Sequence, residues 1–226
     1  ITEEQIECLY DFLSDTELYL SLSYDQLQDW DKARHYQEQS ILHAKLMKDG
    51  EDKIKKVFDY LSLLGTRYHM MGKLTEAKAV REEAYMYVNE TYDPEHPLVL
   101  KAGGRLIEIL NATGEFYDAE RFARVCYEAL TRAPLDPDSY EAANAASNLA
   151  NASLNLINTN GPQSADIDET EMLARKAVRI MKELKGHSSF EMMNAFQVLV
   201  NVILTKEEIT DETRSLLEDY LSDAMK

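Results

Sequence analysis

The chain has 226 residues, 45% of them hydrophobic and 29% charged, so it can bury a substantial core and is neither disordered nor fibrous. Its formal net charge of −17 disfavours binding to nucleic acid or to anionic membrane surfaces, because such partners are bound by clustered Lys and Arg. No apolar run approaches the roughly 18 residues that a membrane span needs. We therefore expect neither nucleic-acid binding nor membrane insertion.

Cysteine usage favours a reducing compartment. Cys8 and Cys126 lie far apart and belong to no CxxC or Cys/His cluster, which argues against a zinc ribbon and a disulfide framework. The sequence opens on Ile1 with no basic and apolar leader, so no signal peptide is expected. These features predict a cytoplasmic protein.

The first predicted helix pair covers residues 2–50. Thr2 with Gln5 resembles a capping box at the start of an apolar pattern with helical spacing. Trp30 and Ala33 precede Leu74 and Ala77 by the same 44 residues, so Trp30 is interpreted as a core anchor. A second helix should end near Gly50.

Acidic residues are concentrated in this first pair. Nine acids precede the first base, Lys32: Glu3, Glu4, Glu7, Asp11, Asp15, Glu17, Asp25, Asp29 and Asp31. If they share a face, they could meet a basic partner segment. The alternative interpretation is a solvated outer face that aids solubility.

The second and third pairs, residues 51–93 and about 97–133, carry the clearest repeat. Small residues at Gly65, Ala77 and Ala84 allow two antiparallel helices to approach closely, and Gly72 supplies the turn between them. The turn glycine and close-contact alanine recur 42 residues later at Gly114 and Ala119. Cys126 falls 42 residues after Ala84, which predicts a structural and not a reactive thiol.

These motifs resemble those of a known family. The period near 42, the segments Gly72-Lys-Leu-Thr-Glu-Ala77 and Gly114-Glu-Phe-Tyr-Asp-Ala119, and the linker Asp93-Pro-Glu-His-Pro97 look like the tetratricopeptide repeats of kinesin light chains and nephrocystin-type proteins. The resemblance implies a right-handed superhelix whose inner groove captures peptides. The aromatic residue that this family has in the middle of the second helix is replaced by Arg81 and Ala123.

The fourth and fifth pairs, about residues 136–186 and 188–226, repeat each other at an offset of 50. Asp136-Pro137 is predicted to start the fourth pair, and its first helix is expected from Ser139 to about Ile157. The last helix should run through Leu216, Leu217, Tyr220 and Leu221. The whole chain is thus predicted to be one all-α tetratricopeptide-type domain, residues 1–226, of about five antiparallel helix pairs.

Candidate binding residues lie on the first helix of each pair, which lines the groove in such a fold. Asn recurs at i and i+7 in two successive helices, although its side chain competes with the helix backbone. Each Asn amide offers a donor and an acceptor to a peptide main chain, and Lys101 with Arg105 could hold an acidic side chain or a carboxylate. The alternative is that these Asn solvate a concave surface or cap neighbouring helices. The candidate set is Asp59, Thr66, His69, Lys101, Arg105, Glu108, Asn111, Asn144, Asn148, Asn151, Asn194 and Asn201.

The sequence therefore predicts a non-catalytic adaptor or scaffold that binds a protein or peptide in its concave groove. It contains no HExxH metal motif, phosphate-binding glycine loop or GxSxG nucleophile motif, so no enzyme activity, metal or cofactor is expected. The alternative function is a structural subunit of a larger assembly that makes contacts through its convex face and ends.

Overall fold

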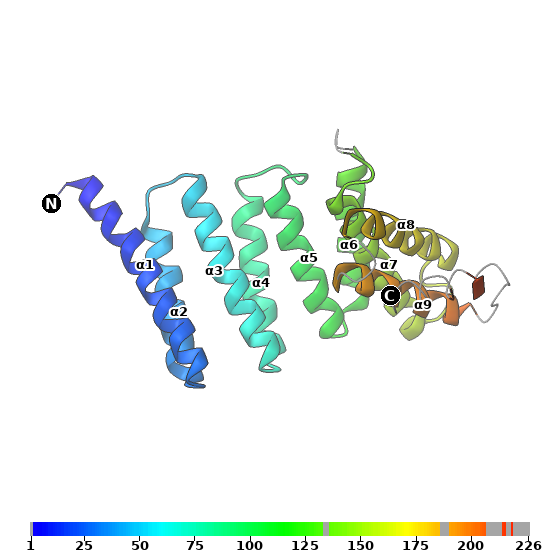
Figure 1. Cartoon of the computed structure of the whole chain (residues 1–226), viewed down its shortest axis with the longest axis horizontal. Helices are drawn as coiled ribbons and strands as arrows, with labels where there is room; N and C mark the ends of the chain where they lie inside the picture. Colours follow the sequence, from blue (N-terminus) through cyan, green and yellow to red (C-terminus); the bar gives the residue numbers. More distant parts are fainter. Residues whose placement is uncertain (1, 133–135, 186–189, 207–213, 216–217, 219–226) are drawn as a thin grey trace. The chain divides into compact units, whose positions relative to one another are not determined.

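The computed structural model describes residues 2–132, 136–185, 190–206, 214–215 and 218. The described residues form nine α-helices and no strand, so the predicted all-α class is confirmed. The helices are α1 (Glu3–Gln26), α2 (Trp30–Leu46), α3 (Glu51–Met70), α4 (Leu74–Asn89), α5 (Pro97–Ala112), α6 (Phe116–Arg132), α7 (Tyr140–Asn160), α8 (Ile167–Lys185) and α9 (Phe190–Thr205) (Figure 1). None of these described helices has the length and apolar character to cross a lipid bilayer.

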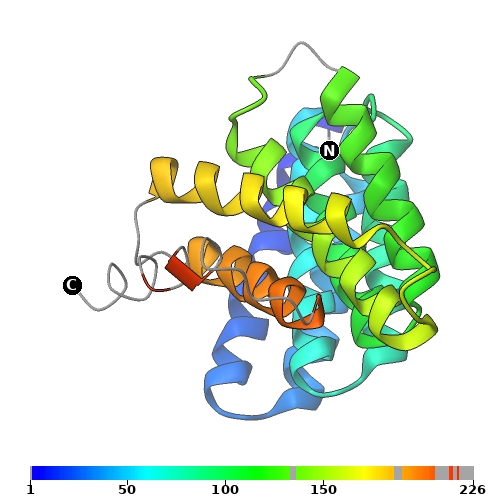
Figure 2. The same ribbon diagram turned by 90° about the vertical axis from the view of Figure 1, so that its right-hand side faces the viewer.

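The helices group into two compact units, Ile1–Asp93 and Pro94–Lys226. The first unit contains α1–α4 as two helical hairpins, and the second contains α5–α9, with α8 and α9 side by side (Figures 1 and 2). Each of the first four predicted pairs contains two observed helices. Of the fifth pair the structure describes α9, and the predicted helix through Leu216 and Tyr220 lies outside the described residues. The prediction of a single domain stays a prediction.

Local sequence signals explain the hairpins. Gly72 and Gly114 adopt φ values of 71° and 80°, the left-handed region that a glycine reaches without steric cost, and each ends the first helix of its hairpin. Ala77 and Ala119 are fully buried where the helices meet. A Cβ on Gly65 would lie 3.0 Å from Cγ of Arg81, so the close approach predicted at Gly65 is confirmed.

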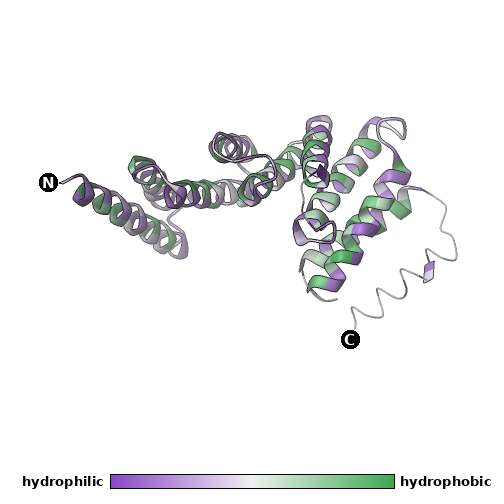
Figure 3. Ribbon diagram, turned by 90° about the horizontal axis from the view of Figure 1, so that it is seen from above, coloured by the Kyte–Doolittle hydropathy of each residue, from purple (hydrophilic) through white to green (hydrophobic). Residues whose placement is uncertain are grey.

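Each helix shows hydrophobic and polar stretches along its length (Figure 3).

Two local predictions were wrong. Trp30 is 45% exposed and begins α2, so it is not a core anchor. The N-cap of α7 is Ser139 and not Asp136, because the side chain of Ser139 accepts a hydrogen bond from the amide of Ala142 at 3.2 Å. Helix α7 continues beyond Ile157 to Asn160.

A buried polar cluster joins three helices of the first unit. The guanidinium of Arg67, on α3, is 6% exposed and pairs with the carboxylate of Asp25 on α1. The same guanidinium donates to the hydroxyl of Ser21 at 3.0 Å and to the side-chain oxygen of Gln37 on α2. The amide of Gln37 in turn donates to the carbonyl of Tyr60 at 3.0 Å. The first unit is therefore held together by a polar contact in its core as well as by apolar packing.

Candidate peptide-binding groove

A cavity of about 700 Å³ opens in the second unit between α5 and α7, with α6 behind it. This volume lies in the range of sites that hold small ligands or part of a peptide. Six of the twelve candidate residues line it: Lys101, Arg105, Glu108, Asn144, Asn148 and Asn194. Residues from three neighbouring first helices of the repeat, α5, α7 and α9, thus meet at one cavity.

Gly104 on α5 determines how closely the Asn side chains approach that helix. A Cβ at this position would lie 3.2 Å from the side-chain nitrogen of Asn148 and 3.8 Å from that of Asn144. Because Gly104 has no side chain, both amides can lie directly against α5. The sequence reasoning missed Gly104, although two successive glycines, Gly103 and Gly104, inside a helix are a signal, since glycine is a poor helix former.

The Asn side chains that line the cavity differ from those outside it in their hydrogen bonding. Asn144, Asn148 and Asn194 donate and accept no side-chain hydrogen bond with any residue that the structure describes. In contrast, Asn155 on α7 donates its amide to the oxygen of Asn111 on α5 at 3.0 Å. Amides normally find a hydrogen-bond partner, so the three cavity-lining amides are available to a ligand or to water.

Three candidates in the second unit do not line this cavity. Asn111 is engaged by Asn155, and Asn151 is half-buried on α7 one turn beyond Asn148. Asn201 is exposed on α9 and accepts a hydrogen bond from Gln197 at 3.0 Å. The i, i+7 pattern of the sequence therefore selected the correct helices, but the cavity is lined by an i, i+4 pair, Asn144 and Asn148.

The three candidates of the first unit are not brought together at a described cavity. Asp59 is exposed on α3, and the hydroxyl of Thr66 donates to the carbonyl of Ser62 at 2.9 Å. The ring of His69 lies 3.3 Å from the guanidinium of Arg81. These residues remain predictions without a described pocket.

Internal ion pairs occupy most of the acids in the amino-terminal hairpin. Lys56 contacts Asp11 and Asp15, the latter at 2.8 Å, and His43 lies 2.7 Å from Glu17. The carboxylates of Asp25, Asp29 and Asp31 contact Arg67, Lys32 and Arg34. Five of these six acids contact the protein closely, whereas Asp31 is 97% exposed and 4.0 Å from Arg34, so it stays open to a partner together with Glu3, Glu4 and Glu7.

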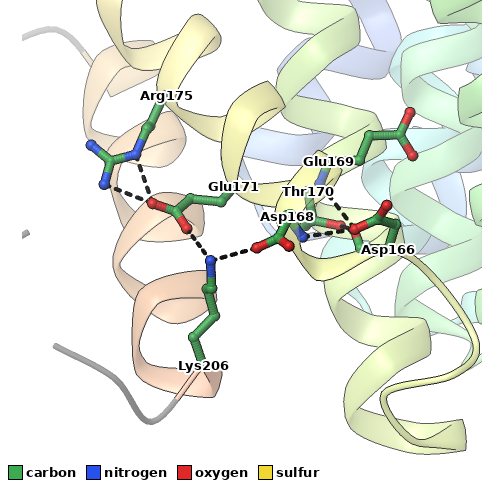
Figure 4. Close-up of polar contacts among 7 residues, drawn as sticks. All are labelled: Asp166, Asp168, Glu169, Thr170, Glu171, Arg175 and Lys206. Carbon is green, nitrogen blue, oxygen red and sulfur yellow. Dashed lines mark hydrogen bonds and ion pairs between the residues drawn. The ribbon is translucent and has the colours of Figure 1, made fainter. Parts of the chain in front are cut away.

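Helix α9, which carries Asn194, is anchored at its end by an ionic cluster (Figure 4). The ammonium of Lys206 lies 2.6 Å from Asp168 and 2.8 Å from Glu171, both in the first turns of α8. Asp166 caps that end of α8 by accepting from the amide of Asp168 at 2.9 Å. The cluster thus ties the end of α9 to the start of α8.

The same end of α8 is also held by α6. Both guanidinium amino groups of Arg124, on α6, bind the carboxylate of Glu169 at 3.0 Å, a bidentate geometry that fixes orientation. Helices α6, α8 and α9 are therefore linked by ion pairs at the start of α8.

Cys126 lies in the wall of the cavity, and burial raises the pKa of its thiol to about 11. The thiolate is the reactive form, so a pKa raised from about 9 leaves roughly 100-fold less thiolate at pH 8. We expect the Cys8→Ser variant to react slowly with a maleimide at pH 8 and faster as the pH approaches 11. The Cys126→Ser variant, which keeps the exposed Cys8, is the control. Equal rates at pH 8 would contradict this structural role of Cys126.

No protein-family model and no curated protein sequence matches the chain. Solved structures do match. The nearly identical TPR-like repeats assigned to a kinesin light chain of Podosopora anserina align with a TM-score of 0.65 at 18% identity, covering 92% of this chain and 93% of that one. A single-residue variant of the same repeats aligns with a TM-score of 0.66 at 18% identity, covering 92% of each chain.

BtubC (BKLC) from P. vanneervenii aligns with a TM-score of 0.69 at 16% identity, covering 98% of this chain and 91% of that one. At these identities the likeness concerns the fold. The predicted all-α fold of helix pairs is thereby confirmed, and the chain has the fold of a tetratricopeptide-type repeat protein.

Proposed function

We propose that the cavity of the second unit binds an extended peptide or partner segment, and that the chain acts as a non-catalytic adaptor or scaffold in the cytoplasm. A tetratricopeptide-type fold suggests a module for protein interaction. The observation that carries the proposal is the set of three cavity-lining amides, on Asn144, Asn148 and Asn194, that have no partner among the described residues. Each supplies one acceptor and two donors to a peptide main chain.

The test is a selection of peptides with the full chain, followed by substitution of the groove. A phage-displayed library of short random peptides is the probe, and peptides that bind are re-measured by titration. Each amide hydrogen bond contributes about 0.5–1.5 kcal/mol, so the double variant Asn144→Ala, Asn148→Ala should bind the selected peptides roughly 30-fold more weakly. If that variant bound them as tightly as the parent, peptide capture at this cavity would be wrong.

The matched control is Asn155→Ala. Asn155 lies on the same face of α7, and its amide is bonded to Asn111 outside the cavity. This variant should lose a little stability and keep its affinity for the selected peptides. Equal losses of affinity in the control and in the double variant would indicate a general disturbance of α7.

The second candidate function, a structural subunit of a larger assembly, is favoured by one surface of the first unit. Phe12 and Tyr19, seven residues apart on α1, are 65% and 69% exposed. Residues spaced in this way share a helix face, and exposed aromatic residues are typical of contact surfaces. In this alternative, partners would survive the substitutions at Asn144 and Asn148 and be lost in the variant Phe12→Ser, Tyr19→Ser.

The internal ion pairs of the amino-terminal hairpin restrict where a basic partner segment could bind. Five of the nine acids have close internal partners, which leaves Glu3, Glu4 and Glu7 in the first turns of α1 and Asp31 in the first turn of α2. A basic segment would therefore have to bind at the start of α1 or of α2.

A further inference from the structure

The charges that line the cavity cancel. Lys101 and Arg105 on α5 are matched by Glu108 on α5 and Glu141 on α7. The guanidinium of Arg105 lies 3.3 Å from the carboxylate of Glu108. The chain as a whole carries a net charge of −17, so an acidic ligand would be repelled at long range and meet no net positive charge on arrival.

The spacing of the two closest amides matches an extended chain. Asn144 and Asn148 are one helical turn apart, which is about 6 Å along the axis of α7. An extended chain presents the N–H and C=O groups of every second residue on the same edge, about 6.6 Å apart. The two amides can therefore bond residues i and i+2 of one ligand.

Most of the remaining lining is apolar, and part of it is open to solvent. Leu98 and Leu100 at the start of α5, Tyr140 at the start of α7 and Cys126 on α6 are half-buried in the cavity wall. Burying a ligand side chain the size of leucine against such a surface favours binding, because it removes apolar area from water. The wall therefore suits an apolar side chain between the main-chain contacts.

Resting on the proposed function, we propose that the cavity selects an extended peptide segment without net charge that carries an apolar side chain. Asn144 and Asn148 hold its main chain, and Gly104 is the positioning residue. Gly104 acts through Asn148, because a Cβ at position 104 would lie 3.2 Å from that amide nitrogen and the amide would have to shift. Lys101 and Arg105 then balance the local acids and do not serve as the principal anchor for an acidic ligand.

The proposal is tested with three sets of synthetic peptides of equal length and equal apolar content, with acidic, neutral or basic flanking residues. Titration of the full chain at high salt, where the attraction between its net charge of −17 and the basic peptides is screened, should give the tightest binding for the neutral set. The affinity of the neutral set should change less than about twofold between low and high salt, and a preference for the basic set that persists at high salt would overturn this inference. If the acidic peptides bound most tightly and their affinity fell steeply with salt, this inference would be wrong, but peptide binding at the cavity would still hold. If none of the three peptide sets bound, both the proposed peptide binding and this inference would be wrong.

Gly104→Ala separates positioning from stability. Alanine is a better helix former than glycine, so the melting temperature should stay the same or rise. The added methyl group would push the amide of Asn148 away, and affinity for the neutral peptides should fall about tenfold, equivalent to about 1.4 kcal/mol. Unchanged affinity in this variant would show that position 104 does not position the ligand-binding amide.

Discussion

Arg67→Met is expected to lower the free energy of unfolding of the first unit by about 3–5 kcal/mol, the cost of removing one partner of a buried ion pair. Arg67 is 6% exposed and supplies the ionic partner of Asp25 as well as hydrogen bonds to Ser21 and Gln37. The other carboxylate oxygen of Asp25 is buried and has no hydrogen-bond partner among the described residues. Without Arg67, this partly buried carboxylate, whose side chain is 25% exposed, would have one buried oxygen and no compensating charge from Arg67.

The measurement is urea denaturation followed by tryptophan fluorescence. Trp30 is the sole tryptophan of the chain and lies on α2, so its emission reports on the first unit. Arg34→Met is the matched control in the same unit, because the side chain of Arg34 on α2 is 40% exposed and pairs with Glu38 at 3.1 Å. Exposed pairs of this kind contribute about 0–1 kcal/mol.

A second substitution checks the mechanism. In Arg67→Met combined with Asp25→Leu, the uncompensated carboxylate is removed and apolar packing replaces the pair, so a large part of the lost stability should return. If Arg67→Met alone cost less than about 1 kcal/mol, the cluster would be a solvated contact and not part of the core.

The sequence did not predict this cluster, and the reason is physical. Hydrophobic periodicity marks which helix face is buried, but it does not show which charged residue is buried with it. Arg67 lies within an apolar segment, and its partners Asp25 and Gln37 are 42 and 30 residues away on two other helices. Only the packed hairpins bring them together.

The hairpins themselves were predictable because their determinants are local. The turn at Gly72 and the close contact at Ala77 recur at Gly114 and Ala119, and each needs only its own helix pair to be satisfied. Trp30 was misplaced because an offset between repeats carries no information about exposure in α2. The expected core position was carried over from Leu74, which is itself half-buried, to a site that is 45% exposed.

Only part of the candidate groove could be predicted from the sequence, because the rest depends on contacts between helices. The recurrence of Asn identified α7 and α9, but the depth of the cavity depends on the neighbouring helix. Asn148 lines the cavity because Gly104 of α5 leaves room for its amide, whereas Asn151 lies outside it one turn later. A pattern within one helix cannot show what the adjacent helix leaves open.

The second large effect on stability is expected when a pair of core residues in the first unit is replaced by the residue types found in the next repeat. Gly65 and Arg81 pack together in the first unit, and Arg81 is 2% exposed. The residues 42 positions later are Ile107 and Ala123, which are 2% and 1% exposed. One repeat thus combines a small residue on its first helix with a large one on its second, and the next repeat does the reverse.

Each single exchange in the first unit should therefore be destabilising. Gly65→Ile would place side-chain carbons against Arg81, whose Cγ lies only 3.0 Å from the point that a Cβ at position 65 would occupy, and overpacking of this kind costs about 1–3 kcal/mol. Arg81→Ala would remove the buried stem of the arginine and leave a void, at a cost of about 2–4 kcal/mol.

The double variant Gly65→Ile, Arg81→Ala reproduces the pair found at Ile107 and Ala123, so it should be more stable than the sum of the single effects predicts. Contacting residues show coupling energies of about 0.5–3 kcal/mol, and here the coupling should be favourable and lie in the upper half of that range. Urea denaturation of the parent, both single variants and the double variant gives this coupling directly. Purely additive losses would mean that the two repeats fill the space between their helices in different ways, and that Arg81 is kept for a contact such as the one with His69, 3.3 Å away, and not for its volume.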